Sequence, residues 1–170
     1  MKTWRIVAVF LALILCGAFL SGCTVKDDMA SRHDIFSYVN ANHGLLEAFP
    51  YTEIPGEPKQ RKAFIKNYLG KKTIVKHVFG YDENVLWFHC GGSGSVNNNY
   101  TASGFYYSKY DIPVGGQEYY LYEVIEVEPG IFECQGEDGH RTFRTEKIRD
   151  NWYYYWEDYF RYFHYEDNTN

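Results

Sequence analysis

Two cysteines and a neighbouring histidine are the residues whose types could support covalent chemistry. Cys90 and Cys134 lie in the part of the chain that follows Cys23. In an exported protein such a pair permits a disulfide, which would close a loop of about 45 residues and contribute about 4 kcal/mol in the chain-entropy model. Two buried thiols that pack as small hydrophobic side chains are the alternative. His89 is poorly placed as a base for a nucleophilic Cys90, because adjacent strand residues point to opposite faces.

The glycine-rich stretch 91–95 matches neither of two catalytic loop motifs. Neither Ser93 nor Ser95 has a glycine two positions away on both sides, as a nucleophile elbow requires. The lysine that follows the last glycine of a phosphate-binding loop is missing as well. We predict a polar surface loop that continues through Asn99 and could contact a ligand.

The histidines and acidic residues form no recognisable metal-binding or catalytic spacing. The six histidines show neither the i, i+4 pairing on a helix nor the short pairing on a strand that zinc sites use. The sequence therefore predicts no metal and no cofactor. Glu123, Glu126 and Glu128 share one predicted strand, and a catalytic carboxylate pair could lie among such residues without being recognisable from spacing.

The segment 152–165 is dominated by aromatic rings, which make up ten of its fourteen residues. On a strand, alternate residues share a face. The face with Trp152, Tyr154 and Trp156 is expected to join the core, and the opposite face carries Tyr153, Tyr155 and Tyr159. Exposed tyrosines pack on glycans and peptides, so these three are candidate ligand contacts. A loop or barrel closure that covers them is the alternative.

The N-terminus has the three parts of an export signal. Lys2 and Arg5 are followed by an apolar run from Ile6 to Phe19 and by small residues that lead into Cys23. No charged residue occurs from Ile6 to Val25. An uncleaved transmembrane helix, which needs about 20 apolar residues, is the alternative, although glycine, serine and cysteine dilute the end of this run.

The exit of this signal, Leu20-Ser-Gly-Cys23, resembles the lipobox of bacterial lipoproteins. The resemblance implies cleavage after residue 22 and acylation of Cys23. It also implies that the protein is held at the extracytoplasmic face of the cell membrane. More than one acyl chain is needed, because burial of about 0.8 kcal/mol per CH₂ makes a single short chain a marginal attachment.

The rest of the chain has the length of one domain. We assign residues 1–22 to the signal peptide, 23–31 to lipid attachment and a polar tether, 32–165 to a single domain and 166–170 to a disordered tail. Without the signal the chain has 15 Lys and Arg against 22 Asp and Glu, a formal net charge of −7. Such an acidic domain is not expected to bind nucleic acid. It should also be repelled by anionic lipid headgroups.

Two helices are predicted before a series of strands. The first spans about 34–49, after a capping-box pattern at Ser31 and Asp34, and Gly44 could bend or break it. The second begins at Pro58 and ends at Gly70, residues favoured at those two positions.

The strands predict an α+β fold. They are expected at 73–79, 85–90, 104–108, 118–128, 131–135, 141–148 and 152–160, with turns at Pro129-Gly130 and Asp150-Asn151. We predict two N-terminal helices packed on a curved antiparallel meander of six or seven strands. An up-and-down β-barrel with outer helices is the alternative.

Two functions of different classes remain after these observations. The absence of catalytic spacing favours a non-catalytic binding or envelope-accessory module with a glycan or protein ligand. The alternative is an exported hydrolase with an acidic active site. The segment Gly104-Phe-Tyr-Tyr-Ser108, followed by Asp111 and Pro113, is similar to a pattern in small uncharacterised bacterial surface proteins. That resemblance implies no activity.

Overall fold

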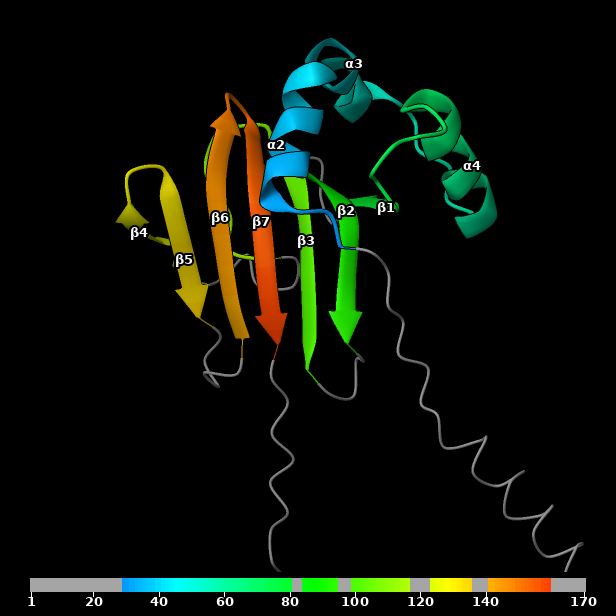
Figure 1. The fold of residues 1–170 in the computed structure, drawn as a ribbon. Helices are drawn as coiled ribbons and strands as arrows, with labels where there is room; N and C mark the ends of the chain where they lie inside the picture. Colours follow the sequence, from blue (N-terminus) through cyan, green and yellow to red (C-terminus); the bar gives the residue numbers. More distant parts are fainter. Residues whose placement is uncertain (1–28, 81–83, 95–98, 117–122, 136–140, 160–170) are drawn as a thin grey trace, which may run out of the picture.

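The computed structural model describes residues 29–80, 84–94, 99–116, 123–135 and 141–159. The fold is α+β, with a seven-stranded antiparallel open sheet and, within the described residues, three α-helices (Figure 1). The helices are α2 (Arg32–Ala41), α3 (His43–Ala48) and α4 (Pro58–Tyr68), with a 3-10 turn η1 (Phe49–Tyr51). The strands are β1 (His77–Gly80), β2 (Val85–Gly94), β3 (Tyr100–Ser108), β4 (Ile125–Glu128), β5 (Ile131–Gln135), β6 (Arg141–Arg149) and β7 (Trp152–Tyr159). The predicted signal, Cys23 and the predicted tail 166–170 lie outside the described residues.

The first predicted helix is divided by an asparagine rather than by a glycine. The capping box forms as expected, since the Asp34 amide donates to Ser31 Oγ at 3.2 Å and the Ser31 amide donates to the Asp34 carboxylate at 3.3 Å. Asn42 ends α2, and its side-chain amide donates to the carbonyl of Tyr38 at 2.8 Å. This side chain competes with the helical backbone for a carbonyl, so the break falls at Asn42 and Gly44 lies inside α3.

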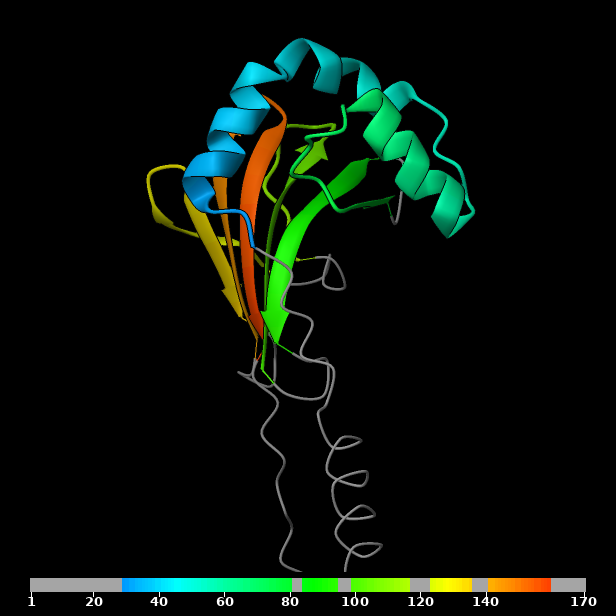
Figure 2. The same ribbon diagram turned by 45° about the vertical axis from the view of Figure 1, so that its right-hand side comes forward.

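The second predicted helix, α4, has the expected ends. Pro58 is its first residue, where the missing amide costs no hydrogen bond. Gly70 follows the C-cap Leu69 with φ 89°, a left-handed conformation that a glycine adopts without strain. The helices form an arch on one side of the sheet, from above β7 to the β1 edge (Figure 2).

The sheet consists of two meanders joined by one long crossover. Its strand order is β1-β2-β3-β7-β6-β5-β4. The chain leaves β3 at the middle of the sheet, starts again at the far edge with β4 and returns to pair β7 with β3. The prediction of a single meander is therefore wrong. The alternative of a β-barrel is also wrong, because the sheet is open, with β1 at one edge and β4 at the other.

Four strands differ in length from the prediction. Strand β3 begins at Tyr100 rather than at Gly104. Strand β4 begins at Ile125, so residues 123–124 are not strand, while 118–122 lie outside the described residues. Strand β1 begins only at His77, so residues 73–76 belong to the connection from α4. Strand β2 continues to Gly94 and pairs with β3 from Tyr100 onward, across a bulge at Cys90. The stretch 91–94 is thus strand and not the predicted loop, and of the remaining predicted loop only Asn99 is described.

Both faces of the sheet carry a hydrophobic cluster. The helix-covered face buries Ile35, Val39, Leu46, Phe49, Ile65, Val78, Phe88, Cys90, Phe105, Trp152 and Tyr154, among others. The opposite face buries Val85, Trp87, Tyr106, Cys134, Phe143, Tyr153 and Tyr155. The rings of Trp87 and Phe143 lie 6.0 Å apart although their strands are three positions apart, about 14 Å in a flat sheet. Side chains thus converge on this face, as on the concave side of a curved sheet.

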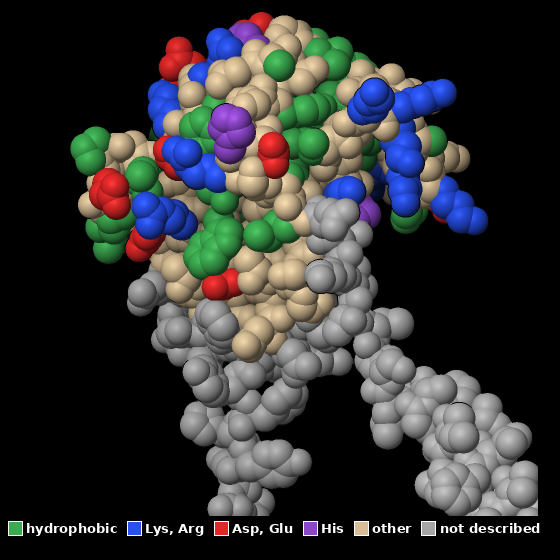
Figure 3. All heavy atoms as spheres, in the orientation of Figure 1, with side chains coloured by type: hydrophobic (Ala, Val, Ile, Leu, Met, Phe, Trp, Pro, Cys, Tyr) green, Lys and Arg blue, Asp and Glu red, His purple; other side chains and the backbone are tan. Residues whose placement is uncertain are grey.

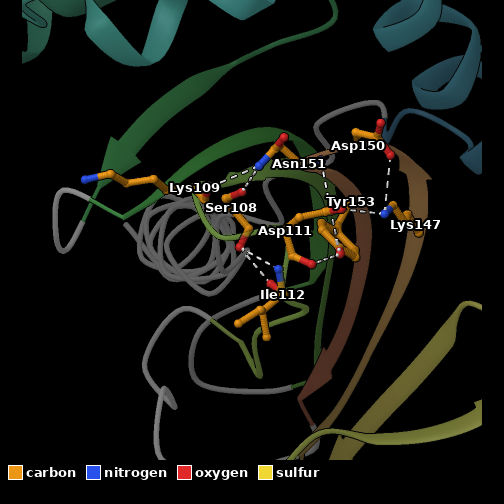
Figure 4. A network of polar contacts seen from close by, with 8 residues as sticks. All are labelled: Ser108, Lys109, Asp111, Ile112, Lys147, Asp150, Asn151 and Tyr153. Carbon is orange, nitrogen blue, oxygen red and sulfur yellow. Dashed lines mark hydrogen bonds and ion pairs between the residues drawn. The ribbon is translucent and has the colours of Figure 1, made fainter.

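A polar network holds the start of the crossover against the second face (Figure 4). Asp111, which has φ 54°, follows β3 and accepts hydrogen bonds from Lys147 Nζ at 2.6 Å and from the Asn151 amide at 2.8 Å. The Tyr153 hydroxyl lies 3.0 Å from the same carboxylate. Further along, the amide of Val114 donates to the Tyr106 hydroxyl at 3.1 Å. The crossover therefore begins as a cover over Tyr153 of β7 and Tyr106 of β3.

Candidate functional site

The candidate site arises from an unbroken cationic segment between Glu57 and β1. Residues 58–76 contain seven of the 15 Lys and Arg downstream of the predicted signal and no Asp or Glu. They are Lys59, Arg61, Lys62, Lys66, Lys71, Lys72 and Lys76. Helix α4 and its connection to β1 bring them together at one end of the molecule, where Figure 3 shows a blue surface over α4.

A groove of about 560 Å³ lies between α4 and the β1 edge of the sheet. Buried Ile65 and Val78, which belong to one core cluster, form part of its lining. Lys59, Arg61, Lys62 and Lys76 line it together with His77, His89 and Tyr100. This volume is within the range of small-molecule sites, about 300–1,000 Å³. A smaller hollow of about 320 Å³ on the same side shares Lys62, Lys76 and His77 and adds Lys66 and Lys71.

The lysines of this region are available to a ligand. All six are exposed, and none takes part in an ion pair with any described residue. Arg61 differs, because its guanidinium donates to the carbonyls of Pro55 at 3.0 Å and Gly56 at 2.9 Å. Arg61 therefore fixes the loop before α4, while the lysines supply the free positive charge.

One row across the sheet connects the groove to the aromatic strand. His89, Gly104 and Tyr155 are register partners on β2, β3 and β7. Gly104 has no side chain, so the Tyr155 ring lies across β3 and its hydroxyl comes within 3.3 Å of His89 Nδ1. His77 pairs with His89 from β1, with ring centroids 6.0 Å apart. Tyr155 thus contacts a groove residue without being exposed in the groove itself.

The predicted tyrosine surface is wrong for two of its three residues. Tyr153 is 2% exposed and Tyr155 is fully buried, because the crossover and neighbouring rings cover them. Tyr159 is half-buried and lies under the Arg141 guanidinium, 4.2 Å from its ring centroid. The alternative of a covered second face is the one observed. The opposite face is the core side as predicted for Trp152 and Tyr154, while Trp156 is half-buried at its margin.

The possible disulfide between Cys90 and Cys134 does not form. Both thiols are free and buried, and they belong to clusters on opposite faces of the sheet. Their strands are four steps apart in the sheet, about 19 Å, whereas a disulfide needs Cα atoms within about 7 Å.

The thiols are also unsuited to nucleophilic chemistry. Burial raises the pKa of Cys90 far above its ordinary value, and burial raises that of Cys134 to about 11. A thiol with so high a pKa is not a thiolate at neutral pH. His89 points to the Tyr155 side of the sheet and Cys90 to the helix side, so their predicted separation is confirmed.

The other polar candidates do not assemble into a site. No three of the described His, Cys, Asp and Glu side chains are grouped so as to hold a metal ion. A hollow of about 310 Å³ near α3 places Glu47 and Asp150 together, but their side chains are 60% and 92% exposed. Carboxylates so exposed to solvent lack the desolvated environment of a catalytic acid pair. Of the three glutamates among which a catalytic pair could have lain, Glu126 and Glu128 lie on the exposed edge strand β4 and Glu123 just before it.

The cationic groove was not anticipated from the sequence, although a signal was present. A search for runs of basic residues finds only the two pairs Arg61-Lys62 and Lys71-Lys72, whereas the absence of acids over 58–76 reveals the segregation of charge. His77 and His89, twelve positions apart, could be brought together only by the pairing of β1 with β2.

Comparison with known proteins provides no relative from which a function could be transferred. No protein-family model, no curated protein and no solved structure matches the chain. Among the described residues, no helix has the length and hydropathy needed to cross a bilayer.

Proposed function

We propose that the protein is a lipid-anchored, extracytoplasmic, non-catalytic binding module whose ligand-binding site is the groove between α4 and the β1 edge. The observation that carries the proposal is the set of exposed lysines that no described carboxylate neutralises. The lipobox-like sequence at Cys23 supports the anchor and the extracytoplasmic location.

The chemistry of the groove favours a ligand with anionic groups and an apolar portion. Lys59 and Lys62 provide point charges that suit phosphate, sulfate or carboxylate. Phe79, Val78 and Ile65 provide apolar contact surface in the same groove. His77 and His89 add hydrogen-bonding groups at its edge.

Binding without catalysis is favoured because the described residues that line the groove include no carboxylate and no thiol. Its lining among the described residues is cationic, aromatic, imidazole and aliphatic. General acid–base hydrolysis by a carboxylate pair would need two acids within about 5–10 Å of each other in one cleft. The glutamates that could form such a pair lie at the opposite edge of the sheet.

Retention on immobilised inorganic polyphosphate tests the groove. Lys62→Gln should lower the salt concentration needed for elution, because it removes one unpaired charge from the lining. Lys109→Gln is the matched control, since Lys109 is also exposed but lies at the end of β3, outside the groove. Equal elution of the two variants would contradict the assignment of the groove, and so would no retention of the unmodified protein.

A further inference from the structure

We infer that the ligand of the cationic surface is the anionic phospholipid bilayer to which the protein is anchored. In this arrangement the domain would lie with α4 and the β1 edge against the headgroups. The inference rests on the proposed function and deepens it by naming the ligand. Three features support it: the distribution of charge, the reach of the tether and the extent of the cationic surface.

Charge is unevenly distributed across the sheet, although Arg144 pairs with Glu128 and Glu133 near the acidic edge and Glu53 and Glu57 are exposed just before α4. The cationic segment 58–76 adjoins β1 at one edge, whereas Glu123, Glu126 and Glu128 lie at or beside β4 at the other. Six steps between strands separate these edges, about 29 Å measured along the sheet. That distance exceeds the Debye length of roughly 8 Å at physiological ionic strength. The net charge of −7 alone predicts repulsion from anionic headgroups, but the cationic edge can approach them because the acidic edge remains screened.

The tether leaves the domain beside the cationic surface. The Ala30 carbonyl accepts a hydrogen bond from Ser103 Oγ at 3.0 Å, which holds the chain on β3. Met29 and Lys76 line the same hollow of about 610 Å³, and Lys76 also lines the groove. Five residues lie between Cys23 and Met29, so an acylated Cys23 lies at most about 22 Å from Met29. So short a tether keeps this side of the domain near the headgroups.

The lysines extend beyond the groove, which favours a surface over a single small ligand. Lys59, Lys62 and Lys66 follow one another at i+3 and i+4 spacing, so they form one stripe along α4. Lys71 and Lys72 continue the exposed charge past the end of the helix. Multiple lysines spread over a face match a plane of phosphate groups, to which juxtamembrane basic residues are attracted.

Amine-reactive footprinting of the lipidated protein tests the inference. The protein is reconstituted in vesicles of phosphatidylcholine alone or of equimolar phosphatidylcholine and phosphatidylglycerol, and the acylation rate of each lysine is measured by mass spectrometry. On anionic vesicles we expect Lys59, Lys66 and Lys71 to react several-fold more slowly than on neutral ones. Lys109 should react equally on both. High salt should abolish the difference, and Lys62→Glu should reduce it while Lys109→Glu should not.

Equal reaction of the α4 lysines on the two kinds of vesicle would overturn the inference. Soluble polyphosphate is added to the neutral vesicles as a further arm. If it protects these lysines while anionic lipid does not, the ligand is a soluble polyanion, so the proposed function stands and the membrane inference fails. If neither probe protects them, both fail. If Lys109→Glu reduces the difference in acylation rate between the two kinds of vesicle as much as Lys62→Glu does, net charge rather than this surface causes the protection, and the inference fails.

Discussion

At the scale of single residues, Asp111 determines how the aromatic strand is covered. Its left-handed φ of 54° turns the chain at the end of β3, a conformation that Asp and Asn adopt more readily than other non-glycine residues. Burial alone would raise the pKa of Asp111, but hydrogen bonds from Lys147, the Asn151 amide and Tyr153 together lower it. The carboxylate is therefore stabilised in its charged form by the groups that join the crossover to β6 and β7.

Asp111→Asn should destabilise the protein by about 1.5–3 kcal/mol near neutral pH, the range for hydrogen bonds to a charged group. Asparagine retains the preference for a left-handed φ, so the loss in free energy of unfolding measures the contribution of the negative charge. Because the folded pKa is lowered, the stability from Asp111 is present above the unfolded pKa of about 3.9 and is lost as pH falls through the folded pKa. The difference between wild type and variant should thus shrink below about pH 4 in urea unfolding curves.

Asp150→Asn is the control for the charge change, because Asp150 is 92% exposed and lies 3.5 Å from the same Lys147. Its effect should be small at every pH. A loss from Asp111→Asn that does not vary with pH would show that packing, and not the carboxylate, holds the crossover.

At the scale of elements, Gly104 allows β3 to lie between a bulged strand and a tyrosine ring. A Cβ at this position would overlap the carbonyl oxygen of Phe88 and lie 2.7 Å from Cε1 of Tyr155. The obstacle on one side is backbone within a paired strand, which cannot rotate away. Gly44 in α3 is the opposite case, since a Cβ there would have no atom of a neighbouring element within 4 Å and its φ is not positive.

Gly104→Ala should therefore destabilise the domain by about 3 kcal/mol or more, beyond the typical cost of an overpacked core site. Gly44→Ala should raise stability by up to about 1 kcal/mol, because alanine favours the helix. Thermal unfolding of the two variants gives the comparison. A Gly104→Ala protein as stable as wild type would mean that the Tyr155 ring does not cross β3 at so short a distance.

The accuracy of the sequence-based predictions differed between kinds of element. The ends of α4 and the turns at Gly130 and Asn151 were predicted correctly because each depends on a conformational preference of one residue. The division of the first helix was placed at Gly44 and occurs at Asn42, where a side-chain hydrogen bond competes with the backbone. The extension of β2 to Gly94 was missed, since glycines favour no strand until β3 pairs with them.

At the scale of the whole molecule, the crossover from β3 to β4 has two consequences. It places β7 in the middle of the sheet, between β3 and β6, so that both faces of this strand are buried along Trp152–Tyr155. It also increases the separation between the strands of Cys90 and Cys134 from the three steps of a simple meander to four, and both thiols are free. Neither consequence could be derived from hydrophobic alternation, which gives the two faces of a strand but not what covers them.

The proposed anchor leads to a prediction about the entire molecule. Cys23→Ala should abolish metabolic labelling with a fatty acid and leave an unprocessed precursor, because the lipobox cysteine is the proposed acyl acceptor. Cys90→Ala is the matched control and should be labelled and processed like wild type, since Cys90 is fully buried. Unchanged mass and membrane retention of Cys23→Ala would indicate a transmembrane helix instead.

The sequence by itself determined those features that depend on the conformational preferences of neighbouring residues. Helix caps, turn residues and strand alternation gave the α+β class, and the composition gave the net charge. Only the tertiary structure decided which tyrosines are covered, that the cysteines lie on opposite faces, and that the cationic segment 58–76 borders a groove with His77 and His89. The physical reason is that exposure, thiol pairing and local electrostatic potential depend on contacts between residues far apart in the chain. Those contacts follow from strand order, which no local preference encodes.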